Sequence, residues 1–201
     1  DFTMFAFRLP LVRTWAWTMA AVALLALGTA HAFDLQGHRG ARGLLPENTL
    51  AGFEHAMQIG VTTLELDIAI TADGTAVISH DPALNPAITR NAQGQWLKGK
   101  GALIKSLKLA ELQAFDVGRT DPSSEYGRGL ADQQPRDGQR IPTLASLFKL
   151  VNDKGAHTIR FDIETKVFPH RPDDTLGVAE FVDVLLAEIR AAGMTRRVMV
   201  Q

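Results

Sequence analysis

Segments with the two-residue period of a β-strand alternate with segments of helical period, and this alternation most constrains the fold of the chain. Strand patterns cover 33–38, 63–70, 75–80, 159–166 and 197–201. Helical patterns cover 48–60, 109–115, 143–151 and 174–192. Strands that alternate with helices predict an α/β protein with a mostly parallel sheet. We expect Asn48 and Thr143 to cap two of the helices and Gly193 to end the last one.

The dipeptide Asp73-Gly74 separates the second strand pattern from the third and predicts a tight hairpin. If these two residues form the whole turn, Asp67 lies opposite His80 on the returning strand. The turn would then place a histidine beside a carboxylate, although a bulge would shift the pairing.

Residues 81–142 differ from the rest of the sequence because they are rich in proline, glycine, asparagine and aspartate and contain only one short helical pattern. A segment of this length with little regular structure is usually functional or an inserted subdomain. We therefore expect 81–142 to be an insertion into the α/β unit.

The strand pattern at 63–70 places leucine and isoleucine on one face and two carboxylates, Glu65 and Asp67, on the other. In an α/β barrel the apolar face meets the outer helices, so the carboxylates would point into the barrel. Two neighbouring carboxylates in a confined site repel each other unless a pKa rises or a cation binds, and oxygen ligands favour Ca²⁺ or Mg²⁺. The alternative is a strand whose acidic face is exposed to solvent.

The strand pattern at 159–166 repeats this division, with Asp162, Glu164 and Lys166 on the polar face. A parallel strand that is buried on both sides should be almost continuously apolar. Two strands with inward charges therefore indicate a polar site at the mouth of a barrel.

Two candidate functional residues lie at the end of the first strand pattern: His38 is its last residue and Arg39 follows it. A histidine at the carboxyl end of a barrel strand is typical of a catalytic group, although the loop backbone could also satisfy its hydrogen bonds. An arginine binds phosphate through its two-pronged guanidinium. With His80, the residues suit hydrolysis of a phosphate diester, in which one histidine accepts a proton and the other donates one. The residues leave open which histidine is the acid.

The N-terminal region has basic residues, then the 14-residue apolar run from Trp15 to Gly28, then Ala30-His31-Ala32. This layout predicts a signal peptide over 1–32 with cleavage after Ala32, because an apolar run that spans a membrane needs roughly 20 residues. The expected location is the periplasm or the outside of the cell, with no stable membrane anchor after cleavage. The alternative is a transmembrane anchor.

Charge and composition exclude several function classes. With 21 Lys and Arg against 22 Asp and Glu, the chain has no basic surplus for binding nucleic acid. It has no cysteine, which excludes disulfides, thiolate metal sites and cysteine nucleophiles from this sequence. Nothing in the composition indicates an oligomeric state.

Seven short motifs in order resemble the glycerophosphodiester phosphodiesterase family of secreted or periplasmic bacterial type, over residues 35–201. They are His38-Arg39-Gly40, Pro46-Glu47-Asn48-Thr49, Glu65-Leu66-Asp67, Asp73-Gly74, His80-Asp81, Ile141-Pro142-Thr143-Leu144 and Glu164-Thr165-Lys166. The resemblance implies a TIM-type (β/α)8 barrel with 81–142 inserted after the second barrel strand. Such a barrel has roughly 250 residues. We therefore expect 33–201 to be a partial barrel domain with about five strands, from a chain truncated at both ends.

The resemblance also implies roles for individual residues. Glu65, Asp67 and Glu164 would hold one divalent cation, Ca²⁺ or Mg²⁺. His38 and His80 would be the general acid and base, Arg39 and Lys166 would contact the phosphate, and Glu47 would support the site. The reaction would be hydrolysis of a small-molecule glycerophosphodiester to glycerol 3-phosphate and an alcohol. The implied route is attack by the neighbouring glycerol hydroxyl to give a cyclic phosphate, which is then hydrolysed.

Two other functions remain open from the residues alone. A phospholipase or lysophospholipase of the D type would use the same barrel on lipid substrates. A non-catalytic periplasmic binding protein would have no need of both histidines and all three carboxylates.

Overall fold

The computed structural model describes residues 33–168 and 170–201, so the predicted signal peptide at 1–32 lies outside the described residues. In the described part of the chain, no helix has both the length and the apolar character needed to cross a membrane.

The centre of the fold is a five-stranded sheet in which four strands follow the order β1-β2-β4-β5. The fifth strand, β3, pairs with the last residues of β2, on the edge opposite β4. The strands are β1 (Gln36–Gly37), β2 (Thr63–Ile70), β3 (Ala76–Ile78), β4 (Arg160–Thr165) and β5 (Val198–Val200). Neighbours in the main order are parallel, whereas β3 is antiparallel to β2. The sheet is mostly parallel and does not close on itself, which is the arrangement of part of a TIM-type barrel.

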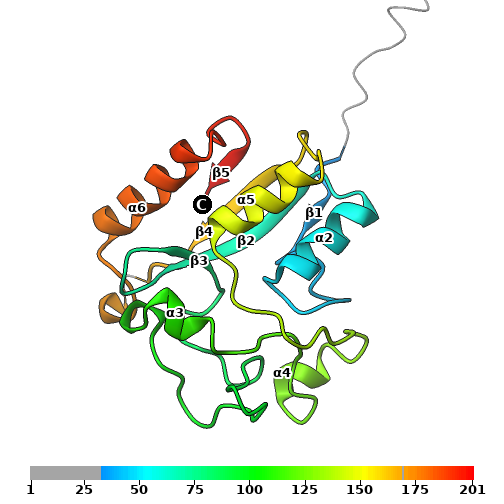
Figure 1. Cartoon of the computed structure of the whole chain (residues 1–201), viewed down its shortest axis with the longest axis vertical. Helices are drawn as coiled ribbons and strands as arrows, with labels where there is room; N and C mark the ends of the chain where they lie inside the picture. The colour runs from blue at the N-terminus through cyan, green and yellow to red at the C-terminus, as the bar shows by residue number, and fades with distance from the viewer. Residues whose placement is uncertain (1–32, 169) are drawn as a thin grey trace, which may run out of the picture. The chain divides into compact units, whose positions relative to one another are not determined.

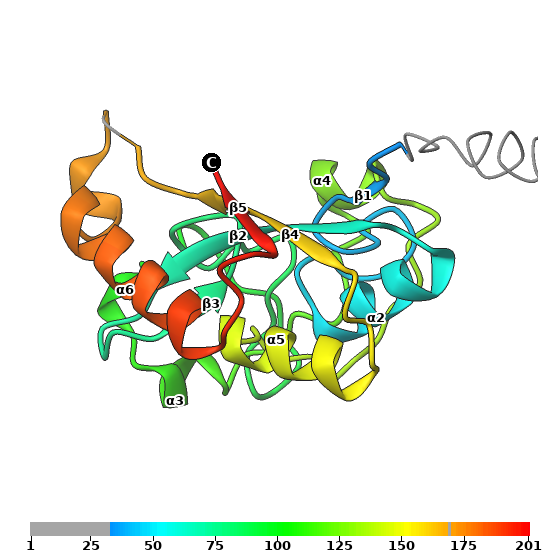
Figure 2. The same cartoon turned by 90° about the horizontal axis from the view of Figure 1, so that it is seen from above.

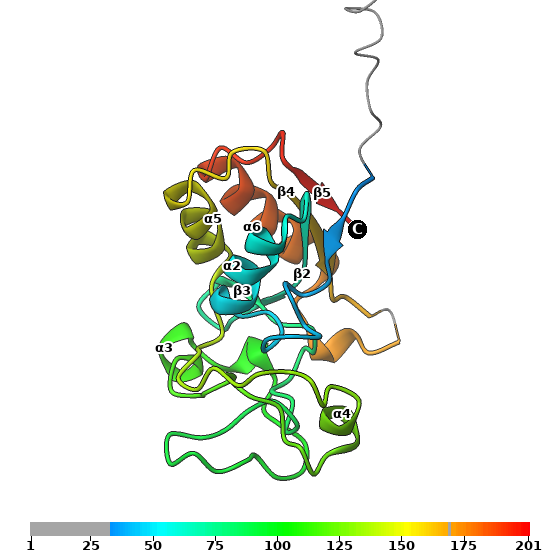
Figure 3. The same ribbon diagram turned by 90° about the vertical axis from the view of Figure 1, so that its right-hand side faces the viewer.

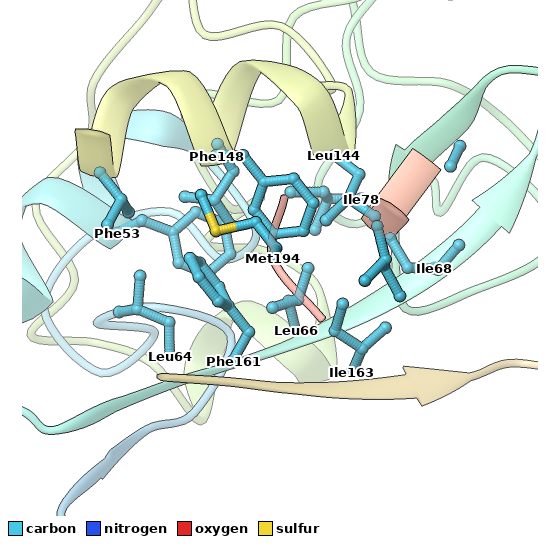
Figure 4. Packing of buried hydrophobic residues seen from close by; sticks show 14 of the residues in the cluster. Phe53, Leu64, Leu66, Ile68, Ile78, Leu144, Phe148, Phe161, Ile163 and Met194 are labelled. Atoms are coloured by element: carbon cyan, nitrogen blue, oxygen red, sulfur yellow. The ribbon is translucent and has the colours of Figure 1, made fainter. Parts of the chain in front are cut away.

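Three longer helices lie against one face of this sheet (Figures 2 and 3). They are α2 (Leu50–Ile59), α5 (Leu144–Asp153) and α6 (Val178–Ala191). Leu64 and Leu66 of β2 and Phe161 of β4 point toward them (Figure 4), and Phe148 of α5 meets Phe161 edge to face with ring centroids 4.9 Å apart. The apolar face of β2 therefore meets the helices, and its carboxylate face is turned away from them, as the alternation predicts.

Two helices begin at residues other than those predicted from the sequence. Thr49, not Asn48, caps α2: it is extended and its hydroxyl accepts a hydrogen bond from the Gly52 N–H. Asn48 adopts a left-handed backbone with φ 52° and uses its side chain elsewhere. Helix α6 begins at Val178 rather than Asp174, because a separate 3₁₀ turn, η2 (Pro172–Asp174), precedes it. The predicted Thr143 cap of α5 is confirmed by its bond from the Ser146 N–H.

The hairpin between β2 and β3 is also one residue longer than predicted. The Thr71 N–H donates to the Thr75 carbonyl, so three residues form the loop, and Gly74 takes the left-handed conformation with φ 75°. The pairing then joins Ile68 to Ile78 and continues to Asp67, whose carbonyl accepts from the Ser79 N–H. The predicted pairing of Asp67 with His80 is therefore wrong.

Residues 81–142 lie to one side of the helix and sheet layers (Figure 1). They contain the 3₁₀ turn η1 (Ile104–Ser106) and two single-turn helices, α3 (Leu109–Leu112) and α4 (Glu125–Arg128). A small apolar cluster that includes Ile104 and Leu112 packs on Ala69 and Val77, the face of the hairpin opposite the main core. The segment thus packs on the sheet where β2 ends.

Candidate functional site

Three carboxylates converge on the face of the sheet that the helices leave uncovered. Glu65 and Asp67 come from β2 and Glu164 from β4, and one oxygen of each lies within 4.8 Å of the others. The parallel register places Asp67 directly beside Glu164, and Glu65 lies one side-chain pair earlier on the same face. Both carboxylates of β2 are buried, so the alternative of a solvent-exposed acidic face is wrong.

Lys166 follows β4 and reaches back into this carboxylate group. Its Nζ lies 2.6 Å from Glu164 Oε2 and 3.0 Å from Asp67 Oδ1, and its side chain is only 6% exposed. Burial alone would lower the pKa of Lys166, but the two carboxylates outweigh it and raise the pKa above the ordinary value for lysine. The ammonium therefore stays charged and offsets part of the negative charge of the site.

Glu65 and Asp162 are two neighbouring buried carboxyl groups on the same face of the sheet. Burial raises the pKa of Glu65 to about 7, while a bond from the Arg39 N–H acts in the opposite direction. Asp162, the register partner of Glu65, is buried and its Oδ1 has no hydrogen-bond partner. A buried carboxylate oxygen without a partner is costly, so this face of the sheet favours cations.

These donors fit a divalent cation. They are carboxylate oxygens from three residues at close range, and hard cations such as Ca²⁺ and Mg²⁺ prefer oxygen ligands. A bound cation would also relieve the mutual repulsion of Glu65 and Asp67, which the burial of both makes severe.

The loop between β1 and α2 is bonded to both carboxylates of β2. The Arg39 N–H donates to Glu65 Oε2 at 2.7 Å, and Asn48 Nδ2 donates to Asp67 Oδ2 at 2.9 Å. Arg39 and Asn48 are the two non-glycine residues of the described chain with positive φ, 51° and 52°, and a backbone bond joins them. Such conformations are sparsely populated and are typical of functional sites.

Gly40 lets this loop pack closely against the start of α2. Its φ is 81°, and a Cβ atom there would come within 2.9 Å of the Gly52 carbonyl carbon. No other residue type fits without moving the backbone, so Gly40 places the preceding Arg39 and His38 at the site.

The carboxylate of Glu47 contacts the guanidinium groups of Arg39 and Arg42 and the phenol of Tyr126. Its Oε1 accepts from Arg39 Nη1 at 3.0 Å, and its Oε2 lies 3.2 Å from Arg42 Nε and accepts from the hydroxyl of Tyr126. Arg39 Nε also lies 3.5 Å from Asp67 Oδ2. The guanidinium of Arg39 is thus held between the acidic group and Glu47, where it can meet an anionic substrate.

The two histidines approach the site from different loops. His38 Nε2 lies 3.9 Å from Glu65 Oε2, and its side chain is 59% exposed. Burial of the ring's inner part, together with the charges of Arg39 and Arg42, lowers the pKa of His38 below its ordinary value. A neutral imidazole is therefore favoured at this position.

His80 follows β3 and is oriented by an acidic neighbour. Its Nδ1 lies 3.0 Å from Asp81 Oδ1, and Asp81 Oδ2 accepts from Asn85 Nδ2 at 2.8 Å. His80 lines a small pocket together with Glu47 and Asn48. A carboxylate on Nδ1 fixes the imidazole and leaves Nε2 for proton transfer.

Contacts link seven of the eight residues predicted for the site, whereas the side chain of His80 is bonded to Asp81 and shares a pocket with Glu47. Their roles stay predictions. Sequence reasoning missed Asn48 as a side-chain partner of Asp67, and Arg42 and Tyr126 as partners of Glu47. The Pro46-Glu47-Asn48-Thr49 motif could have indicated Asn48, whereas Tyr126 lies in a segment without a periodic pattern.

Comparison with known proteins gives a consistent result. The sequence profile of the glycerophosphoryl diester phosphodiesterase family matches residues 38–201. A glycerophosphodiester phosphodiesterase of Caldanaerobacter subterraneus is 35% identical over 117 residues, which are 58% of this chain and 40% of that protein. The chain spans 40 to 50% of the length of the first three curated relatives.

Solved structures show the same likeness. A protein of Silicibacter pomeroyi assigned as a glycerophosphoryl diester phosphodiesterase is 39% identical with a TM-score of 0.76, over 82% of this chain and 56% of that one. An Oleispira antarctica phosphodiesterase, solved with the product sn-glycerol-3-phosphate, is 26% identical with a TM-score of 0.53, over 83% of this chain and 64% of that one.

Proposed function

Because this chain belongs to the glycerophosphoryl diester phosphodiesterase family, we propose that the protein containing it hydrolyses glycerophosphodiesters to glycerol 3-phosphate and an alcohol. The observation that carries the proposal is the convergence of three carboxylates with Arg39 and Lys166 on one face of the sheet. The product bound to the Oleispira antarctica relative supports the choice of product.

The charged groups suit an anionic diester. Glu65, Asp67 and Glu164 would hold one divalent cation, Ca²⁺ or Mg²⁺, which when bound would polarise a phosphoryl oxygen. Arg39, fixed by Glu47, and Lys166, fixed by Asp67 and Glu164, would neutralise and orient the phosphate. Such preorganised charges stabilise the negative charge that grows in the transition state.

The two histidines would move the protons. One imidazole would accept the proton of the attacking oxygen, which is the neighbouring glycerol hydroxyl or a water molecule, as the new P–O bond forms. The other would donate a proton to the oxygen of the departing alcohol as its P–O bond breaks. If the glycerol hydroxyl attacks first, a cyclic phosphate results and a water molecule then opens it to glycerol 3-phosphate.

We also propose that residues 1–32 direct export, that 33–201 is the barrel domain with 81–142 as its insertion, and that the mature enzyme acts in the periplasm or outside the cell. The apolar run and the Ala30-His31-Ala32 sequence support the export proposal. Detection of a mature N-terminus at Phe33 in secreted or periplasmic protein would test it, and an uncleaved chain would contradict it.

The activity is tested with the full-length protein and glycerophosphocholine in Ca²⁺, in Mg²⁺ and in chelator. We expect cation-dependent release of glycerol 3-phosphate, its loss in His80→Ala, and little change in the matched variant His157→Ala, whose side chain is exposed on a loop. If lysophosphatidylcholine is hydrolysed to a phosphorylated lipid and glycerophosphocholine is not hydrolysed, the result would favour the lysophospholipase D alternative. Binding without turnover of either substrate would favour the binding-protein alternative.

A further inference from the structure

We propose that Tyr126, which belongs to the inserted segment, is a positioning residue that sets the affinity of the site for phosphate by fixing Glu47 and, through it, Arg39. The inference rests on the proposed function for its biological meaning, but the phosphate affinity that it concerns is measurable without turnover.

The hydroxyl of Tyr126 contacts two residues of the site, Glu47 and Arg39. It donates to Glu47 Oε2 and lies 3.4 Å from Arg39 Nη1, which can donate to it. The other oxygen of Glu47 accepts from the same guanidinium at 3.0 Å. The three groups form a closed ring of contacts, and this ring restrains the orientation of Arg39.

The ring of Tyr126 adds a second restraint. The guanidinium of Arg42 lies 5.0 Å from the ring centroid, within the range of a cation–π contact, and its Nε lies 3.2 Å from Glu47 Oε2. Tyr126 thereby contacts both of the cations that share the Glu47 carboxylate. Without the hydroxyl, Glu47 Oε2 keeps only its contact with Arg42, and the carboxylate is free to rotate away from Arg39.

The position of Tyr126 is itself well defined by local bonds. Helix α4, which carries it, is capped by Ser124, whose hydroxyl accepts from the Gly127 N–H. Burial, together with the negative charge of Glu47, raises the pKa of Tyr126, so its hydroxyl remains a donor at neutral pH.

The segment is held to the same loop by bonds that do not involve Tyr126. Gln133 Nε2 donates to the Arg42 carbonyl and the Gln134 N–H donates to the Leu44 carbonyl, both at 2.8 Å. These contacts anchor the insertion to the loop at residues 39–47. The loss of one hydroxyl should therefore change the orientation of Arg39 without detaching the segment.

The test compares Tyr126→Phe with Ser123→Ala in the full-length protein. Each variant removes one hydroxyl from the same segment, but Ser123 is exposed and its hydroxyl contacts only Asp121. For Tyr126→Phe we expect the Kd for inorganic phosphate, measured by calorimetry at a saturating concentration of the activating cation, to rise roughly tenfold, the scale of one hydrogen bond to a charged group. The KM for glycerophosphocholine should rise by a similar factor and kcat should change less, while Ser123→Ala should change neither by more than about twofold.

A double-mutant cycle with Glu47→Gln separates positioning from general structural damage. If Tyr126 acts through Glu47, then Tyr126→Phe should have little further effect in the Glu47→Gln background. Equal losses in both backgrounds, or a phosphate Kd for Tyr126→Phe within twofold of Ser123→Ala, would overturn the inference.

Two further outcomes are distinguishable. If Tyr126→Phe does not fold, Glu47→Gln alone must raise the phosphate Kd by the same factor, and an unchanged Kd in that variant would also overturn the inference. If the wild type hydrolyses no glycerophosphodiester, the proposed function fails, but the phosphate Kd still decides the role of Tyr126.

Discussion

The helix and sheet layers and the inserted segment 81–142 are stabilised in different ways. In the layers, apolar faces of β2 and β4 are buried under α2, α5 and α6, and aromatic rings such as Phe148 and Phe161 fill the space between them. The insertion has a smaller apolar cluster and a network of ions, in which Arg90 joins Asp116 to Asp137. The first region is specified by periodic burial and the second by individual polar contacts.

The two regions also contribute different residues to the site. The layers supply the carboxylates, because a buried strand can present alternate side chains with the spacing of its backbone. The insertion supplies Tyr126, which contacts Glu47 and Arg39 of the loop between β1 and α2. A change in the layers should therefore damage folding or chemistry outright, whereas a change in the insertion should act by smaller degrees.

The largest expected effect comes from the core of the layers. Phe161→Ala removes a fully buried ring and should lower the free energy of unfolding by about 3–5 kcal/mol. Chemical denaturation of the full-length protein measures it, with Phe161→Leu as the milder control. A loss below about 1 kcal/mol would contradict the assignment of the main core.

A change at the carboxylates should affect chemistry. Asp67→Asn keeps the shape of the side chain but leaves Arg39 and Lys166 without a shared anion. We expect kcat/KM for glycerophosphocholine to fall by more than about 100-fold, together with weaker cation binding. Full activity in this variant would show that the carboxylate group is structural.

The ionic network of the insertion should give a moderate, salt-dependent effect. Asp116 accepts from Arg90 and from the N–H groups of Gly118 and Gly138. Asp116→Asn should cost about 1–3 kcal/mol of stability, with a smaller loss in high salt, while the phosphate Kd changes by less than about threefold. Denaturation curves at two salt concentrations check this, and a loss as large as that of Phe161→Ala would remove the contrast between the regions.

The smallest expected effect concerns the hairpin turn. Gly74 has φ 75° in open space, so Gly74→Ala should cost about 1 kcal/mol through backbone strain alone. Gly74→Asn should be tolerated better, because asparagine adopts this conformation more readily. Equal stability of the alanine variant and the wild type would contradict the three-residue loop.

Sequence reasoning succeeds where a residue's neighbours follow from its spacing. The alternation in 63–70 correctly separates Leu64 and Leu66 from Glu65 and Asp67, because opposite faces of a strand meet different surroundings. The hairpin fails by one residue, because Asp73-Gly74 suits both a two-residue and a three-residue loop. A shift of one residue exchanges the two faces of a strand. The prediction therefore pairs Asp67 with His80, whereas the structure pairs it with Ser79.

The rest of the site depends on contacts between residues far apart in the sequence. Tyr126 is 79 positions from Glu47, and no local pattern connects the two. Nothing near Arg42 in the sequence indicates its role, because its partner ring comes from the insertion. The sequence predicts Asn48 as a helix cap, because an asparagine side chain can fill either role and only the position of Asp67 decides between them.

The glycine of the His38-Arg39-Gly40 motif has a consequence for how relatives of this protein are classified. Gly40 is required because the loop backbone touches the start of α2, so the requirement comes from packing rather than from contact with a substrate. A descendant that had lost its activity would still need this glycine in order to fold. The glycine therefore marks shared ancestry, and recognition of active members in genome surveys should rely on residues of the proposed site, such as Glu65, Asp67 and Lys166, instead.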